Sequence, residues 1–127
     1  YVCHPLTTYG EVQDNMRKAT EAARAVAETN CVPVSPLHAF SFFMDTEKHE
    51  EIASRRFIMD CCLSLLKACD QLWAFEGWQY SKGCKQEVKF CFKHKIPVYE
   101  AKIKEGVVCE LREIKWKDYK RKTGGDV

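Results

Sequence analysis

The sequence predicts a single-domain α/β protein, a three-layer sandwich around a five-stranded, mostly parallel sheet. Two observations lead to this prediction. Short apolar runs alternate with longer segments whose apolar residues recur every three or four positions, which is typical of strands alternating with helices. The chain has 127 residues and is 46% hydrophobic, which is enough to bury one core but crowded for two. We therefore expect helices on both faces of one sheet.

The first half of the chain provides two of the expected strands and two of the expected helices. Two short apolar runs end at His4-Pro5 and Ser35-Pro36, where proline favours an extended conformation in the residue before it. An aromatic-rich loop is expected after the second run. Amphipathic spacing marks the two helices. The predicted strands are 1–3 and 31–34, and the predicted helices are 11–29 and 47–69.

The second half continues the same alternation. A compact apolar run precedes a third amphipathic segment, and Gly106 separates the last two apolar runs. Alternation of this kind implies right-handed crossovers and a flavodoxin-like arrangement of the sheet. The predicted strands are 70–75, 96–99 and 107–111, the predicted helix is 81–95, and the expected domain spans 1–114, followed by a basic, partly disordered tail at 115–127.

Composition limits the partners that the chain can be expected to have. Its formal net charge is only +2, so nothing indicates a nucleic-acid partner. We expect its eight cysteines to be reduced, and their spacing matches no zinc motif, so no metal or cofactor is predicted. There is no apolar run of about 20 residues and no signal-like segment. We therefore expect a cytoplasmic protein without a membrane partner.

The segment from Ser81 to Glu87 is the one that suggests chemistry. Ser81 suits the N-cap of a helix, Gly83 permits close approach, and first-turn amides favour an anion such as phosphate. A plain capped helix explains Ser81 and Gly83 equally well. Glu87 lies one turn further on the same face, where a carboxylate can stabilise or attack the anomeric carbon of a sugar. On its own, a glutamate on a helix is more often simply solvated.

The run SKGCKQEVKFCFKHKIPVY, preceded by ACDQLWAF, resembles the SxGxxxE helix and following IPV strand of the nucleoside 2-deoxyribosyltransferase-like superfamily. The segments YVCHPL, DNMRKATEAARAVAE and CVPVSPLH extend the resemblance over residues 1–99, and it is strongest to the short bacterial and phage branch. That superfamily includes deoxynucleoside 5′-monophosphate N-glycosidases. The resemblance implies a cofactor-free hydrolase of nucleotide metabolism that binds a nucleoside or nucleotide and forms a homodimer or a larger homo-oligomer.

The resemblance also implies roles for individual residues. Glu87 would be the nucleophile, and Tyr1 would hydrogen-bond and position it. Asp60 would bind the base or sugar and pass a proton to the leaving base, while Ser81 and Gly83 would hold the 5′ end. Purely structural readings remain open: Asp60 as a surface acid beside an arginine, and Tyr1 as an aromatic packed on the sheet.

Further residues are candidates for binding the substrate. His4 stands where the family often has glycine, which changes the mouth of the expected pocket. The others follow expected strands, flank the anion-binding turn or, for Asn15, stand near the start of the first expected helix. Loop packing or a subunit contact explains most of them equally well, and a surface role is the favoured alternative for Asn15. The full set of these candidates is His4, Pro5, Asn15, His38 and Trp78.

Three alternatives to hydrolysis remain open. Transfer of the sugar to a second base needs a pocket that receives that base before water, so hydrolysis is the simpler prediction. A non-catalytic protein that sequesters or senses a nucleotide-derived signal, and an inert scaffold, also fit, because a fold does not fix a function. In the oligomer that the resemblance implies, the aromatic residues Phe40, Phe42 and Phe43 can supply the contact between subunits.

Overall fold

The computed structural model describes residues 1–6, 11–44 and 55–124. It contains a four-stranded mixed sheet in the order β1-β2-β3-β4, in which β1 pairs with β2 and β2 with β3 in parallel, while β3 and β4 are antiparallel. The prediction of a five-stranded, mostly parallel, flavodoxin-like sheet is therefore wrong. The strands are β1 (Val2–Cys3), β2 (Leu72–Ala74), β3 (Val98–Lys104) and β4 (Val107–Ile114).

The predicted strand at 31–34 is absent, although this segment does lie beside β1. The backbone N–H of Val2 donates to the carbonyl oxygen of Val34 at 2.8 Å, but no ladder develops from this bond. Pro33 lacks an N–H and so cannot take part in a ladder as a donor. The segment covers the β1 edge of the sheet without becoming a strand.

The antiparallel pairing of β4 follows from a tight turn. Glu105 and Gly106 have φ angles of 54° and 77°, and the flanking residues Lys104 and Val107 are partners. A two-residue turn with both φ angles positive is the type that joins antiparallel strands. The last two strands therefore form a hairpin rather than a parallel extension of the sheet.

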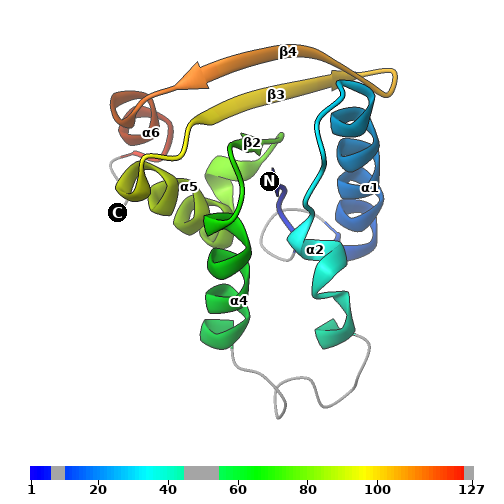
Figure 1. Cartoon of the computed structure of the whole chain (residues 1–127), viewed down its shortest axis with the longest axis horizontal. Coiled ribbons are helices and arrows are strands. Elements are labelled where there is room, and N and C mark those ends of the chain that lie inside the picture. The colour runs from blue at the N-terminus through cyan, green and yellow to red at the C-terminus, as the bar shows by residue number, and fades with distance from the viewer. Residues whose placement is uncertain (7–10, 45–54, 125–127) are drawn as a thin grey trace.

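Helices cover both faces of the parallel strands, as predicted (Figure 1). One face packs against α1 (Val12–Glu28), and the other packs against α4 (Arg55–Lys67) and α5 (Lys82–His94). The aromatic segment between α1 and α4 forms α2 (Pro36–Ala39) and a 3-10 turn, η1 (Ser41–Met44). The predicted helix at 47–69 begins within residues that the structure does not describe, and its described part is α4.

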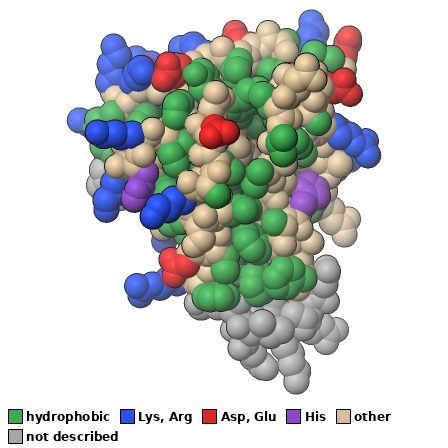
Figure 2. Space-filling model, viewed as in Figure 1, with side chains coloured by type: hydrophobic (Ala, Val, Ile, Leu, Met, Phe, Trp, Pro, Cys, Tyr) green, Lys and Arg blue, Asp and Glu red, His purple; other side chains and the backbone are tan. Residues whose placement is uncertain are grey.

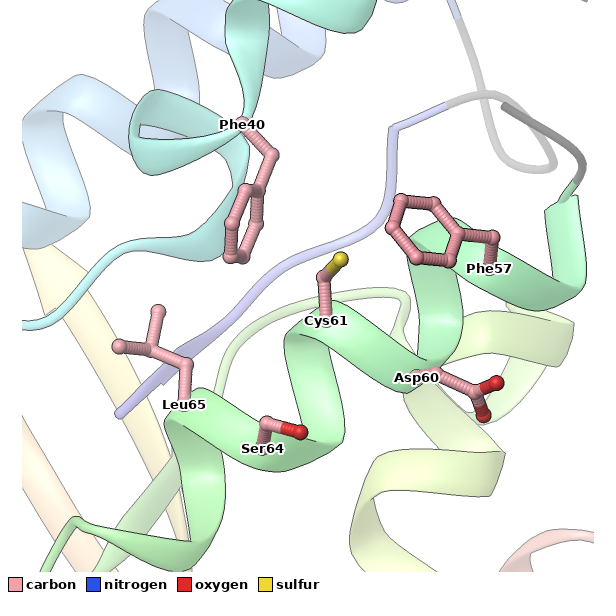
Figure 3. A pocket seen from close by; sticks show the side chains of 6 residues that line it. All are labelled: Phe40, Phe57, Asp60, Cys61, Ser64 and Leu65. Carbon is pink, nitrogen blue, oxygen red and sulfur yellow. The ribbon is translucent and has the colours of Figure 1, made fainter. Parts of the chain in front are cut away.

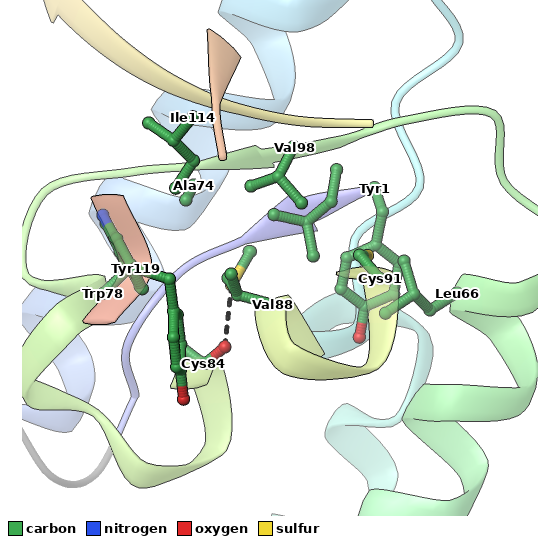
Figure 4. Close-up of a cluster of buried hydrophobic side chains, with 12 residues drawn as sticks. Tyr1, Leu66, Ala74, Trp78, Cys84, Val88, Cys91, Val98, Ile114 and Tyr119 are labelled. Carbon is green, nitrogen blue, oxygen red and sulfur yellow. Dashed lines mark hydrogen bonds between the residues drawn. The ribbon is translucent and has the colours of Figure 1, made fainter. Parts of the chain in front are cut away.

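The alternation of side chains along β1 assigns its residues to the two faces. Tyr1, labelled in Figure 4, lies with Cys3 in the core cluster that includes residues of α4 and α5, whereas Val2 lies in the cluster with α1. This alternation decides which residues can reach Glu87.

The expected C-terminal tail contains a packed helix, α6 (Trp116–Lys122), so the expectation of a frayed segment does not hold there. Tyr119 is 1% exposed and stacks on Trp78 and Trp116. Trp116 and Tyr119 are three residues apart and share one helix face, which leaves Lys117 and Lys120 exposed to solvent. None of the helices in the described part of the chain has the length and hydropathy that a membrane crossing requires.

Candidate functional site

Glu87 lies on the buried face of α5. Ser81 caps this helix, because its Oγ accepts a hydrogen bond from the backbone N–H of Cys84 at 3.2 Å. The buried positions then follow helical spacing and face the sheet, and Glu87, which is only 6% exposed, shares this apolar face. The residues of the buried face are Cys84, Glu87, Val88 and Cys91.

Each carboxylate oxygen of Glu87 accepts a hydrogen bond, one from Tyr1, which directly precedes β1, and one from Cys3 of β1. The hydroxyl of Tyr1 donates to Oε2, and the thiol of Cys3 donates to Oε1 at 3.4 Å. Tyr1 and Cys3 are two residues apart and therefore point to the same face of the sheet. The predicted hydrogen bond between Tyr1 and Glu87 is confirmed. The catalytic role that the resemblance implies for the pair stays a prediction.

The buried surroundings set the protonation of these three groups. Desolvation raises the pKa of Glu87 to about 7, although the hydrogen bonds from Tyr1 and Cys3 act to lower it. Burial, reinforced by the charge of Glu87, raises the pKa of the Tyr1 hydroxyl far above its usual value. Burial likewise raises the pKa of the Cys3 thiol. Tyr1 and Cys3 therefore stay protonated as donors, and Glu87 is the member of the group that titrates near neutrality.

The same cluster contains atoms that could ligate a metal ion. The sulfurs of Cys3 and Cys84 and a carboxylate oxygen of Glu87 lie within 4.8 Å of one another, and all three residues are buried. Zinc accepts thiolate and carboxylate ligands, but both thiols would first have to lose their protons. Because the Cys3 thiol is protonated, it donates a hydrogen bond to Glu87 instead of offering a thiolate to a metal ion.

Ser81 has a local structural task beside the role that the resemblance assigns to it and to Gly83. The side chain of Ser81 is buried and already engaged as the helix cap. A Cβ atom added to Gly83 would lie 3.4 Å from the Cε of Met59 on α4. An added Cβ would therefore only touch the end of a flexible side chain, so packing against α4 does not by itself require glycine at this position.

Asp60 lies apart from the Tyr1–Glu87 pair. It is exposed on α4 and lines a shallow surface hollow of about 450 Å³ beside aromatic side chains, with its carboxylate directed away from Phe40 and Leu65 (Figure 3). Among the contacts of the described residues, none joins Asp60 to Glu87. The hollow is lined by Phe40, Phe57, Asp60, Cys61, Ser64 and Leu65.

Three other candidates line a larger groove of about 1160 Å³. This groove lies beyond the carboxyl ends of β1 and β2, between α1 and the β3–β4 hairpin, and Glu87 is not part of its lining. His4 Nδ1 lies 2.8 Å from the carbonyl oxygen of the fully buried Pro5, and desolvation lowers the pKa of His4. Asn15 Nδ2 donates to the carbonyl of Leu6 at 2.8 Å. Trp78 Nε1 donates to Glu100 Oε2 at 2.8 Å.

His38 belongs to neither the hollow nor the groove. Its Nδ1 lies 2.6 Å from Ser35 Oγ, and its Nε2 lies 2.9 Å from Thr20 Oγ1. Both ring nitrogens are therefore engaged, and the side chain ties α2 to α1. This arrangement favours the loop-packing interpretation of His38 over ligand contact.

Sequence reasoning missed residues both around Glu87 and in the larger groove. Cys3, the second donor to Glu87, could have been found from the two-residue period that it shares with Tyr1. Glu100 was also missed; its carboxylate accepts from Trp78 and pairs with Arg112 at 2.9 Å and Lys122 at 3.2 Å. These partners come from separate elements, so no local pattern in the sequence marked Glu100.

Comparison with known proteins gives a family but no activity. Neither the curated proteins nor the solved structures include a match to this chain. Residues 1–101 match the sequence model of a family described as a domain of unknown function, DUF7768. This match covers β1 through the middle of β3, with both members of the Tyr1–Glu87 pair. The chain belongs to the DUF7768 family.

Proposed function

We propose that this chain hydrolyses the N-glycosidic bond of a nucleoside or nucleoside 5′-monophosphate, with Glu87 as the nucleophile. The observation that carries the proposal is the buried Tyr1–Glu87 pair, in which a hydroxyl orients a carboxylate whose pKa is raised to about 7. An acidic group with a strongly shifted pKa and a fixed partner is a candidate for catalysis. The resemblance of the SxGxxxE segment supports a sugar as the substrate.

The reaction would proceed in two displacements. The ionised Glu87 carboxylate attacks the anomeric carbon, a carbon–oxygen bond forms, and the base leaves with the electron pair of the broken carbon–nitrogen bond. Water then attacks the same carbon, returns the electron pair to Glu87 and loses a proton. The departing base must gain a proton. Asp60, the expected donor, has no described contact with the pair, so in this proposal the base takes its proton from solvent, and the proton that the attacking water loses balances it.

A substrate would need a place to bind near the pair, and the hollow beside α4 supports one. Leu65 lines this hollow and also packs against the core cluster that contains Tyr1. Apolar side chains cover this part of the surface, over α4 and the α2 region (Figure 2), which suits the flat face of a base. In this proposal, the hollow holds the base beside the core cluster that contains Tyr1.

A second candidate function is nucleotide binding without catalysis. The near-complete burial of Glu87 favours it, because a nucleophile must meet its substrate. In that case Glu87 would hold β1 on α5 through Tyr1 and Cys3, and the ligand would stay intact.

The test is the release of free base from a panel of ribo- and deoxyribonucleosides and their 5′-monophosphates, followed by chromatography. We expect the unmodified chain to release base from at least one substrate and both Glu87→Gln and Glu87→Ala to abolish release. Glu28→Gln, at an exposed position of α1, is the matched control and should keep full activity. Adding a second free base distinguishes transfer from hydrolysis. Retention of an intact nucleotide without release would overturn the enzymatic proposal in favour of binding.

A further inference from the structure

The two edges of the sheet differ. The segment containing Val34 lies along β1, whereas no described segment pairs with the outer side of β4, which runs along the margin of the molecule (Figure 1). Two of the exposed large apolar side chains lie on this strand, Val107 at 58% and Leu111 at 42% exposed. An open edge presents unpaired backbone N–H and C=O groups, and proteins usually cover or protect such an edge.

Backbone geometry restricts how β4 could pair with another copy of itself. The N–H and C=O groups of every second residue point outward, and opposed residues in an antiparallel pair must both point outward or both inward. A residue with an even number in one copy must therefore lie opposite an even-numbered residue of the other copy, and an odd-numbered residue opposite an odd-numbered one. Beyond the irregularity opposite Lys102 and Ile103, the regular part of the strand spans 110–114. A centre at Glu113 would oppose two glutamates, and a centre at Ile114, the last residue of the strand, would bring in residues beyond the strand. The pairings left to compare are centred on Glu110, Leu111 or Arg112.

Charge selects one of these three pairings. A centre at Glu110 or Arg112 would place two like charges directly opposite each other, which is destabilising. A centre at Leu111 places the two leucines together and sets each Glu110 opposite the Arg112 of the second copy. Both charged side chains are more than half exposed, so a partner strand can reach them.

The neighbouring strand extends this complementarity. Within one chain, Arg112 pairs with Glu100 of β3 at 2.9 Å, and Glu110 pairs with Lys102 of β3 at 3.4 Å. Pairing about Leu111 would therefore create two rows of alternating charge across four strands. Each row would run from Glu100 and Arg112 of one copy to Glu110 and Lys102 of the other.

We propose that β4 is a self-association edge, at which two copies pair antiparallel about Leu111 and join their sheets into one. The proposal does not depend on the proposed function. It also places the contact on a different surface from the aromatic segment around Phe42. The pairing strands are short, so the dimer is of the weak, concentration-dependent kind.

Sedimentation velocity from micromolar to millimolar concentration tests this proposal. We expect the unmodified chain to pass from monomer to dimer over this range. Glu110→Arg or Arg112→Glu should each weaken association by about tenfold or more, because every opposed charge pair becomes repulsive. An equimolar mixture of these two variants should dimerise again, because each then supplies the charge that the other lacks.

Two further variants complete the test. Leu111→Lys, which opposes two lysines at the centre, should also abolish the dimer, whereas Arg24→Glu on α1 should leave it unchanged. Thermal unfolding followed by circular dichroism confirms that each variant is folded. A chain that stays monomeric at millimolar concentration, or a dimer that survives both charge reversals, would overturn the proposal.

Discussion

At the scale of single residues, Glu87 combines two opposing influences. Burial away from water disfavours a charge on its carboxyl group, while Tyr1 and Cys3 each donate a hydrogen bond that favours it. Burial is the larger influence, so the carboxyl group holds its proton to about pH 7. This balance makes the group sensitive to pH in two measurable ways, through stability and through rate.

The first consequence concerns stability. The pKa of Glu87 rises from 4.5 in the unfolded chain to about 7 in the folded one, so the folded state binds more protons between these values. Its contribution to stability is fully present below pH 4.5 and is lost as the pH rises through 7. We expect the free energy of unfolding to fall by roughly 3 kcal/mol more in the unmodified chain than in Glu87→Gln between pH 4.5 and 8. Urea denaturation measures these free energies. If they changed equally with pH in the two proteins, the raised pKa of Glu87 would be contradicted.

The second consequence concerns rate. A carboxyl nucleophile acts only when ionised, so kcat/KM for base release should rise with pH and level off above about 7. Tyr1→Phe removes a hydrogen bond that lowers the pKa of Glu87, and the midpoint of the pH profile should therefore move upward. A lower rate with an unchanged midpoint would show that Tyr1 does not act through the ionisation of Glu87.

At the scale of elements, local patterns predicted what local contacts determine. The helix after Ser81 was predicted correctly because residues close together in the sequence determine both its N-cap and its buried face. The prediction of a strand at 31–34 was wrong because Pro33 interrupts a run that otherwise has strand composition. The antiparallel hairpin was not predicted, because Gly106 was interpreted only as a break between two strands. Glu105 and Gly106 in fact form a complete two-residue turn.

The last helix shows how a few aromatic residues can outweigh a basic composition. Tyr119 packs among Trp78, Phe92 and Trp116, so we expect Tyr119→Ala to cost about 3–5 kcal/mol in the free energy of unfolding. Lys120→Ala, at the next position but exposed, should change it by less than about 0.5 kcal/mol. Denaturation of the two variants by urea checks this difference. Equal stability of the two would mean that α6 is not part of the folded core.

At the scale of the whole molecule, the predicted site residues divide between separate regions. The alternation of side chains along β1 could have predicted part of this division, because Tyr1 and Cys3 face α5 while Val2 faces α1. The positions of Asp60 and His38 depend on how helices pack, which no spacing within the sequence reveals. The family resemblance therefore predicted the hydrogen bond between Tyr1 and Glu87, but nothing in the sequence placed the residues around that pair.

The most direct test of Glu87 as a nucleophile is to trap its covalent intermediate. A fluorine at the 2′ position of the nucleoside identified by base release destabilises the positively charged transition states and slows breakdown of the glycosyl ester. Intact-mass and peptide mass spectrometry should then show one sugar attached to the peptide that contains Glu87, and no adduct in Glu87→Gln. Base release without such an adduct, or an adduct on another residue, would contradict the account.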